Sequence, residues 1–316
     1  PAAVDLVGYN YTESRYQDDH RRYPDRIIYG SENRHDLAAW QAVSNNDHIF
    51  GQFLWTGIDY LGESGPWPAR GSTAGLLDLA GRVKSLGHYR AALWSEQPVC
   101  RLATQPLPSA DRNARRRRGR QPATSPYALP LWNYEAGRRV RVMCATNAPV
   151  VRLLLNGSPV GGDAQTDDAT QMRYWDVDYQ PGQLLCQAFA AGADSIPAAT
   201  DTLQTSGLPY ALIARVDTTG ATQGDRVVHI EVAVVDSKGR QVVMADNDIA
   251  CRVQGGGRLI GLENGDIADT SDARQHHRRA HQGSLLAYVS RPATGERAAR
   301  VVFTSPLLRT AEVVLR

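Results

Sequence analysis

Hydrophobic residues after position 130 come in short, β-branched runs separated by turn signals, and this pattern limits the possible fold more than any other feature. Such runs predict strands, and the Asn156-Gly157 pair after the run 150–155 predicts a tight hairpin. With a break at 205–207, the pattern favours two immunoglobulin-like β-sandwiches, over residues 131–206 and 207–316. The expected strands are 139–145, 150–155, 172–177, 184–190, 210–216, 227–235, 249–253, 285–289, 301–304 and 313–315.

Residues 1–98 have a different pattern, in which apolar runs alternate with helical segments. Strands are expected at 4–9, 26–30 and 49–55, with helices at 36–44 and 85–94. Strands separated by helices are typical of parallel βα units, so the chain is predicted to combine an α/β part with an all-β part. Residues 99–130 contain five prolines and an arginine run at 115–120, and they are expected to form a linker or insertion.

The composition argues against several classes of protein. The 316 residues carry 35 basic and 33 acidic side chains, which gives no general attraction to nucleic acid or to a membrane surface. No window approaches the roughly 18 unbroken apolar residues of a transmembrane helix, and we expect no signal peptide at the start. The four cysteines, Cys100, Cys144, Cys186 and Cys251, lack metal-ligand spacing and are expected to be buried as small apolar residues.

The strongest candidate for chemistry is Glu32, which lies just after a predicted buried strand. The C-terminal ends of parallel strands are where barrel enzymes carry their catalytic groups. A retaining glycosidase needs one ionised carboxylate as nucleophile and one protonated carboxylate as acid, about 5 Å apart. The alternative is that Ser31 caps the following helix and that Glu32 is an acid in its first turn.

Trp55 ends the next expected strand and is soon followed by Asp59. Sugars present apolar C–H faces, so an aromatic side chain beside a catalytic carboxylate fits a carbohydrate site. The alternative is that Trp55 fills the core and that Asp59 belongs to a structural ion pair. Because Trp55 follows the next strand after Glu32, we expect these two side chains at adjacent positions.

Several stretches together resemble the C-terminal part of glycoside hydrolase family 2, in its β-galactosidase-like branch. They are 7–11, 23–32, 51–63, 67–70 and 77–81 in the first part, 131–134 and 153–157 in the first sandwich, and 260–266 and 279–283 in the second. The resemblance covers nearly the whole chain except residues 99–128. It implies that residues 1–98 are the last three strands of a (β/α)8 TIM barrel, followed by two immunoglobulin-like β-sandwich domains.

The resemblance also implies roles for four residues. Glu32 matches the nucleophile, and Tyr9 would hydrogen-bond and position its carboxylate. Trp55 would form part of the sugar-binding floor, and His35 matches a sugar-contacting histidine. The implied activity is hydrolysis of terminal β-linked sugars with retention, foremost β-galactosides, with β-glucuronides or β-mannosides as alternative substrates. No cofactor and no metal site is expected in these residues.

The chain lacks two parts that this activity requires. A (β/α)8 barrel takes about 250 residues, whereas the barrel part here is residues 1–98. The family's acid/base glutamate lies in an Asn-Glu pair on strand four, and this sequence contains no Asn-Glu pair. We therefore expect the upstream part of the barrel, with the acid, to come from the same longer protein or from another chain. This chain alone is expected to be catalytically incomplete.

A second hypothesis belongs to a different class of protein. It is a non-catalytic carbohydrate-binding or scaffolding protein built on the two sandwiches. The aromatic side chains of the first sandwich are candidates for binding sugar, with core packing as the alternative for most of them: Trp132, Tyr134, Tyr174 and Trp175. The arginine run at 115–120 is interpreted as solvated loop charge, and His276, His277 and His281 as surface residues without a metal. By analogy with the family, we expect a periplasmic or extracellular location.

Overall fold

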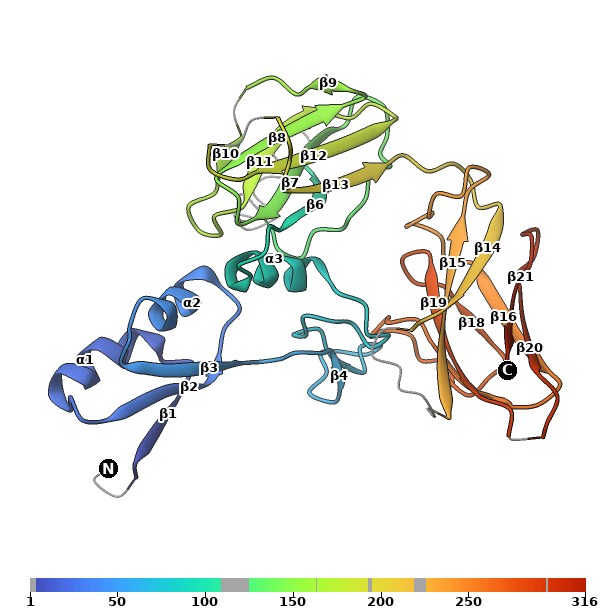
Figure 1. Ribbon diagram of the computed structural model, residues 1–316, viewed down its shortest axis with the longest axis horizontal. Coiled ribbons are helices and arrows are strands. Elements are labelled where there is room, and N and C mark those ends of the chain that lie inside the picture. The colour runs from blue at the N-terminus through green and yellow to red at the C-terminus, as the bar shows by residue number, and fades with distance from the viewer. Residues whose placement is uncertain (1–3, 109–124, 163, 193–194, 219–225, 294) are drawn as a thin grey trace.

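The computed structural model describes residues 4–108, 125–162, 164–192, 195–218, 226–293 and 295–316. This described chain is mostly β-sheet with few helices. Figure 1 shows a small sheet with helices near the N-terminus and two β-sandwiches, joined by a central segment that carries α3. None of the helices in the described residues is both long and apolar enough to cross a bilayer. The predicted arginine run at 115–120 lies outside the described residues.

The N-terminal part is a three-stranded parallel sheet in the order β1-β2-β3. The connections between its strands carry the helices, and the carboxylate of Asp36 caps α2 by accepting a 2.8 Å hydrogen bond from the Ala39 N–H. The predicted alternation of parallel strands and helices is therefore confirmed. The elements are β1 (Leu6–Asn10), η1 (Glu13–Arg15), α1 (Tyr16–Arg22), β2 (Ile27–Asn33), α2 (Leu37–Ser44) and β3 (Ile49–Leu54).

This N-terminal sheet has a small core. Its buried cluster consists of Tyr16, Ile28, Val43 and Ile49, from two helices and two strands. Both outer strands, β1 and β3, lack a further strand partner within the described residues. Several strand side chains that are apolar and large are about half exposed or more, namely Leu6, Ile27, Phe50 and Phe53. Unpaired strand edges and exposed apolar side chains of this kind are sites where further strands or another surface can pack.

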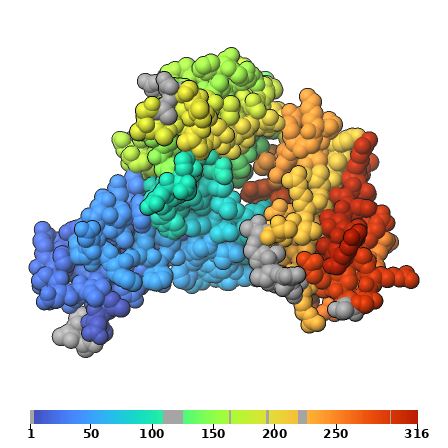
Figure 2. Space-filling view, viewed as in Figure 1, coloured from blue at the N-terminus to red at the C-terminus, as the bar shows by residue number. Residues whose placement is uncertain are grey.

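The central segment, residues 55–98, contains a short hairpin and a helix. The strands β4 (Tyr60–Leu61) and β5 (Gly71–Ser72) pair with each other, and α3 spans Ser85–Trp94. In the space-filling view of Figure 2, this segment lies at the centre, between the N-terminal part and the two sandwiches.

Side chains of the central segment attach it to both sandwiches. From α3, Leu86 and Tyr89 share a buried cluster with Met143 of the first sandwich. Arg82 donates hydrogen bonds to the Ser284 hydroxyl and to the carbonyl oxygens of Asn264 and His281 in the second sandwich. The part of the molecule that follows β3 is thus held together by both apolar packing and hydrogen bonds.

The first sandwich consists of two antiparallel sheets, ordered β10-β11-β7-β6 and β13-β12-β8-β9. Asn156 and Gly157 join β8 to β9 with φ values of 52° and 81°, so the predicted hairpin is confirmed. Its strands are β6 (Cys100–Pro106), β7 (Arg139–Thr146), β8 (Val150–Leu155), β9 (Ser158–Pro159), β10 (Gln165–Thr166), β11 (Arg173–Asp178), β12 (Gln183–Phe189) and β13 (Ala199–Gln204).

The first sandwich begins earlier than the sequence predicted. Strand β6 lies within residues 99–130, which were expected to be a linker or insertion, and it pairs with β7 along its whole length. Pro106 is compatible with this strand because β6 is at the edge of its sheet in the described part of the chain. The linker prediction is therefore wrong for residues 100–106, and residues 109–124 lie outside the described ranges.

The second sandwich also consists of two sheets, ordered β14-β15-β19-β17 and β18-β16-β20-β21, with antiparallel pairing. Ile230, Val301 and Phe303 are fully buried between them. Its strands are β14 (Ala211–Val216), β15 (Val227–Val235), β16 (Asp248–Gln254), β17 (Leu259–Glu263), β18 (His277–Arg279), β19 (Ser284–Ser290), β20 (Ala299–Thr304) and β21 (Ala311–Leu315).

Candidate active site

The carboxyl ends of β1, β2 and β3 meet at one edge of the N-terminal sheet, because the three strands are parallel. Glu32 lies near the end of β2, where it is half-buried beside the fully buried Asn33. Strand β2 continues through Glu32, and α2 begins only after Asp36. The alternative in which Ser31 caps a helix is therefore wrong, and Glu32 is a strand-end carboxylate.

Tyr11 is the tyrosine that contacts Glu32. Its backbone N–H donates to the Glu32 carbonyl oxygen at 2.9 Å, and its phenol lies near the Glu32 carboxylate. Burial raises the pKa of Tyr11, and the neighbouring Glu32 carboxylate raises it further. The phenol therefore stays protonated at neutral pH, when it can donate to a carboxylate. The Arg34 guanidinium lies 5.3 Å from the centre of the Tyr11 ring.

Tyr9, which the sequence predicted as the partner of Glu32, is directed elsewhere. Its hydroxyl donates a 2.5 Å hydrogen bond to the Asp19 carboxylate of α1. Burial raises the pKa of Tyr9, and the hydrogen bond to Asp19 adds to this, while the same bond lowers the pKa of Asp19. The pairing register of β1 shifts between Tyr9 and Asn10, and Tyr11 has a left-handed φ of 51°. This local turn gives Tyr11 the position that was predicted for Tyr9.

Trp55 follows β3 directly and is 37% exposed, so the alternative of a core-filling tryptophan is wrong. Its indole N–H donates a 3.0 Å hydrogen bond to the Tyr60 hydroxyl, and the two rings meet edge to face at 5.7 Å. The Tyr60 hydroxyl in turn donates to the Glu63 carboxylate. Tyr60 also contributes to the raised pKa of Tyr11, so the groups around Trp55 and Glu32 are close to each other.

His35 supports the backbone around Trp55 in this structure. Its Nε2 lies 2.8 Å from the Ala74 carbonyl oxygen, while its buried Nδ1 has no hydrogen-bond partner among the described residues. Burial lowers the pKa of His35, and the nearby backbone carbonyl oxygens oppose that effect only in part. The ring therefore contacts the adjacent loop, and the sugar contact of His35 stays a prediction.

Two aromatic residues of this cluster, Tyr11 and Tyr60, were not predicted as site residues. Both lie inside stretches that carry the family resemblance, 7–11 and 51–63, so the sequence contained a signal for them. The signal located the segments correctly. It could not tell which tyrosine of the first segment faces Glu32.

The other residues that the sequence suggested for chemistry are buried or paired with neighbouring side chains. Asp59 is buried, and it accepts a 2.7 Å hydrogen bond from the Lys84 ammonium. This contact is the structural ion pair that was given as the alternative for Asp59. Trp132 and Trp175 are buried in the first sandwich and offer no open face to a sugar. His277 lies 3.1 Å from the Asp248 carboxylate, on the second sandwich. Among the described residues, one group has side chains close enough to share a metal ion, the thiols of Cys100, Cys144 and Cys186.

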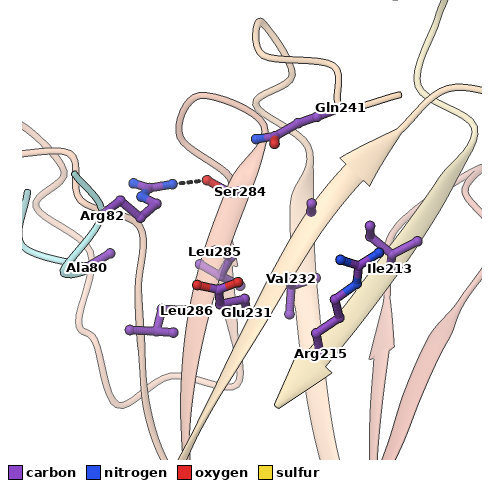
Figure 3. Close-up of a pocket in the computed structure, with 11 residues that line it drawn as sticks. Ala80, Arg82, Ile213, Arg215, Glu231, Val232, Gln241, Ser284, Leu285 and Leu286 are labelled. Carbon is purple, nitrogen blue, oxygen red and sulfur yellow. Dashed lines mark hydrogen bonds between the residues drawn. The ribbon is translucent and has the colours of Figure 1, made fainter. Parts of the chain in front are cut away.

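A cavity of about 230 Å³ lies between residues 80–82 and the sheet of β14, β15 and β19. Figure 3 shows Arg82 reaching Ser284 on one side of it, with Glu231 and Arg215 on the neighbouring strands. Figure 1 places these strands at the opposite end of the molecule from β1, β2 and β3. The cavity is therefore separate from Glu32, and it lies at the junction that Arg82 bridges.

Two family models match parts of the chain, and curated relatives match most of it. Residues 213–314 match the glycoside hydrolase family 2 C-terminal domain 5, and residues 137–195 match a domain of unknown function, DUF4982. A β-galactosidase of Bacteroides ovatus, BoGH2A, is 29% identical over 85% of this chain and 28% of its own length. A putative β-glucuronidase of Formosa agariphila is 26% identical over 76% of this chain and 21% of its own length.

Solved structures show the same relationship. The crystal structure of a glycosyl hydrolase family 2 member from Bacteroides cellulosilyticus superposes with a TM-score of 0.86 and 26% identity. The match covers 99% of this chain and 42% of that chain. The described fold is therefore the one that this relative has over less than half of its length.

Proposed function

We propose that the complete protein is a retaining β-glycosidase of glycoside hydrolase family 2, with this chain as its C-terminal portion and Glu32 as nucleophile. The observation that carries this proposal is the position of Glu32 at the carboxyl end of a parallel strand, where the Tyr11 N–H bonds its carbonyl oxygen at 2.9 Å and the Tyr11 phenol lies beside its carboxylate. The exposed ring of Trp55 beside this pair is an additional feature of a carbohydrate site.

The proposal includes a barrel that extends beyond these residues. We take β1, β2 and β3 as the last three strands of a (β/α)8 barrel, whose catalytic groups project from the carboxyl ends of the strands. The open edges of β1 and β3 and the exposed side chains of Phe50 and Phe53 support this assignment, because further strands and helices would cover them. The upstream part of the barrel, from the same or another chain, is thus a proposed partner of this surface.

In the proposed reaction, the Glu32 carboxylate attacks the anomeric carbon of a terminal β-linked sugar and displaces the leaving group. A covalent glycosyl–enzyme intermediate forms, and water then hydrolyses it with retention of configuration. Tyr11 would hold Glu32 for attack and remain hydrogen-bonded to it as its negative charge is lost. Trp55 would pack its ring against the apolar face of the sugar. The acid that protonates the leaving group belongs to the upstream part of the barrel.

The leading substrate is a β-galactoside, since the relative with 29% identity is named a β-galactosidase. A β-glucuronide is the alternative with a named relative, and a β-mannoside is a further alternative. Comparing kcat/KM on the aryl β-galactoside, β-glucuronide and β-mannoside decides among them. The galactoside should be hydrolysed with the highest kcat/KM, and a higher value for the glucuronide would contradict the substrate assignment.

The nucleophile is tested in the complete protein with Glu32→Ala and the same change of a neighbouring carboxylate, Glu63→Ala. The first variant should lose at least about 10³-fold in kcat, because the covalent step is removed. Added azide should restore turnover and give a glycosyl azide of inverted configuration, since the small anion replaces the carboxylate. If the Glu63 variant shows this loss and azide rescue while the Glu32 variant stays active, the assignment of Glu32 is refuted.

Tyr11 and Tyr9 form a second matched pair of variants. Removal of one hydrogen bond to a charged group costs about 1.5–3 kcal/mol, so Tyr11→Phe should lower kcat by roughly 10–100-fold. Tyr9→Phe should keep nearly full activity because its hydroxyl bonds Asp19. The reverse ranking would mean that Tyr9 positions the nucleophile in the complete protein.

The isolated chain gives a further readout with an activated aryl β-galactoside, whose leaving group departs with little help from an acid. Slow hydrolysis that disappears in Glu32→Gln would show that these residues assemble a working nucleophile. Without the upstream strands we expect no more than slow hydrolysis, because general acid catalysis contributes about 10²–10⁴-fold.

A further inference from the structure

We propose that the first sandwich carries an oxidative modification site, in which Cys144 and Cys186 form a disulfide that joins its two sheets. Cys144 lies on β7 and Cys186 on β12, and these strands belong to opposite sheets. Their Sγ atoms are 3.5 Å apart as thiols. This is a contact between two buried side chains, and the sulfurs must approach to about 2 Å for the bond to form.

A third thiol, Cys100, touches the same sulfur. Its Sγ lies 3.7 Å from that of Cys144. Cys100 is on β6, the strand next to β7, where it pairs with Thr146 and stands diagonal to Cys144. Cys144 is thus the central thiol of the group, with one potential partner across the sandwich and one within its own sheet.

The pairing across the sandwich is favoured on geometric grounds. Cys186 is the nearer partner of Cys144. Inward-facing side chains of two packed sheets point toward the opposite sheet, so these two thiols approach each other head-on. A diagonal pair on neighbouring strands has its Cα–Cβ bonds directed side by side, which is poor geometry for a disulfide. We therefore assign Cys144–Cys186 as the bond and Cys100 as the thiol that remains.

The surroundings favour a disulfide over a shared metal ion. All three cysteines belong to one buried cluster whose other members are hydrophobic, including Trp132, Leu153 and Leu184. Three metal-bound thiolates would bring net negative charge into this apolar core, and buried charge without compensation is costly. A disulfide is neutral and apolar, so it fits the same space at no such cost.

The reaction needs an oxidant, which is a small-molecule disulfide such as oxidised glutathione. The Cys144 thiolate attacks one glutathione sulfur, and the released glutathione thiolate takes up the proton that Cys144 lost. The Cys186 thiolate then attacks Cys144 in the mixed disulfide, so one protein disulfide forms and a second glutathione leaves and is protonated. Two electrons pass from the protein sulfurs to the glutathione disulfide. Because the three thiols are at most 2% exposed, the bond must form while the sandwich folds.

The test refolds the full chain in a mixture of oxidised and reduced glutathione, with a sample in reductant as reference. After denaturation, free thiols are alkylated and the linked peptides are identified by mass spectrometry. We expect two free thiols, Cys100 and Cys251, and one linked pair, Cys144–Cys186. The oxidised chain should unfold at a temperature about 5 °C or more above the reduced chain in the transition of the first sandwich.

Two variants make the outcome specific. Cys144→Ala should abolish the linked peptide and the difference in unfolding temperature, whereas Cys251→Ala should keep both, because Cys251 is buried alone in the second sandwich. Four free thiols in refolded protein with native circular dichroism would overturn the proposal. So would a Cys100–Cys144 link as the main product, or one zinc or copper ion bound to the native chain and lost in Cys144→Ala.

Discussion

The N-terminal sheet and the second sandwich have strands of similar length but differ in how their apolar side chains are covered. The sandwich gathers 18 residues into one buried cluster, whereas the sheet has a buried cluster of four. Phe303 of the sandwich is fully buried, while Phe50 of the sheet is 73% exposed. The sandwich thus has a closed core, whereas the sheet leaves much of its apolar surface exposed, as the proposed barrel would require. The proposed nucleophile lies on this open sheet.

The largest expected consequence concerns local stability. A domain with a closed core has a free energy of unfolding of about 5–15 kcal/mol. A segment with few buried contacts opens locally at a much lower free energy. Backbone amides of β1, β2 and β3 in the isolated chain should therefore exchange their hydrogens at least about 10³-fold faster than those of β15 and β19. Hydrogen exchange followed by mass spectrometry measures this difference. Equal protection in the two regions would mean that the sheet is already complete.

A matched pair of phenylalanine variants sharpens the comparison. Phe303→Ala removes a fully buried ring and should lower the free energy of unfolding of the second sandwich by about 3–5 kcal/mol. Phe50→Ala removes an exposed ring and should change the stability of the isolated chain by no more than about 0.5 kcal/mol. Urea unfolding followed by circular dichroism gives both values. In the complete protein, Phe50→Ala should become clearly destabilising, and a cost that stays small there would contradict the proposed barrel.

The sequence predicted elements best where a local pattern sets the structure. The run 150–155 and its Asn156-Gly157 turn form β8 and the following hairpin as expected, because positive φ at both turn residues is favoured by those residue types. Residues 85–94 form α3 over the predicted range. Among the elements that were missed are β6 and α1, together with the strands β13, β17 and β18. Strand β6 ends in Pro106 and resembled a linker, and α1 has the sequence YQDDHRR, whose polar residues give little apolar periodicity.

In the candidate site, the position of the carboxylate could be predicted from the sequence, but the side chain that contacts it could not. The end of β2 identified Glu32 as a strand-end carboxylate, because the position of a residue along a strand follows from local pattern. The choice between Tyr9 and Tyr11 depends on a register shift and on one left-handed residue, which are set by pairing with β2. Neither feature leaves a periodic signal in the sequence. The contact of Cys144 with Cys186 also needs the packing of two sheets and cannot be read from spacing.

A smaller effect is expected at the junction between the central segment and the second sandwich. Arg82→Ala would leave the Asp78 carboxylate and the Asn264 and His281 carbonyl oxygens without this donor. The loss should be about 1–3 kcal/mol of unfolding free energy. Arg274→Ala is the matched control, because its ion pair with Asp272 is exposed and should contribute less than about 1 kcal/mol. Equal losses in the two variants would show that Arg82 does not couple the two parts.

The smallest expected effects concern the pH dependence of stability, which should differ between the two sandwiches. In the second sandwich, burial alone would raise the pKa of Asp269, but hydrogen bonds from Ser271 and the charge of Arg278 lower it to about 2. Its folded pKa is below its unfolded value, so its contribution to stability is complete above the unfolded pKa, near pH 4, and is lost as the pH falls toward 2. In the first sandwich, burial raises the pKa of Asp201, and the hydrogen bond from the Leu102 N–H opposes this only in part.

Asp201 should therefore have the opposite effect on stability. Because its carboxyl binds a proton more tightly in the folded state than in the unfolded state, its contribution to the free energy of unfolding increases as the pH falls. Between pH 5 and pH 2, the Asp269→Asn variant should lose less stability in the second sandwich than the parent chain does. Asp201→Asn should remove a stabilising effect of acid from the first sandwich. Pulses of pepsin at increasing urea concentration, with cleavage sites mapped by mass spectrometry, report each sandwich separately in this pH range. If both variants change the acid dependence of stability in the same direction, the opposite pKa shifts of Asp269 and Asp201 do not govern the response of the sandwiches to acid.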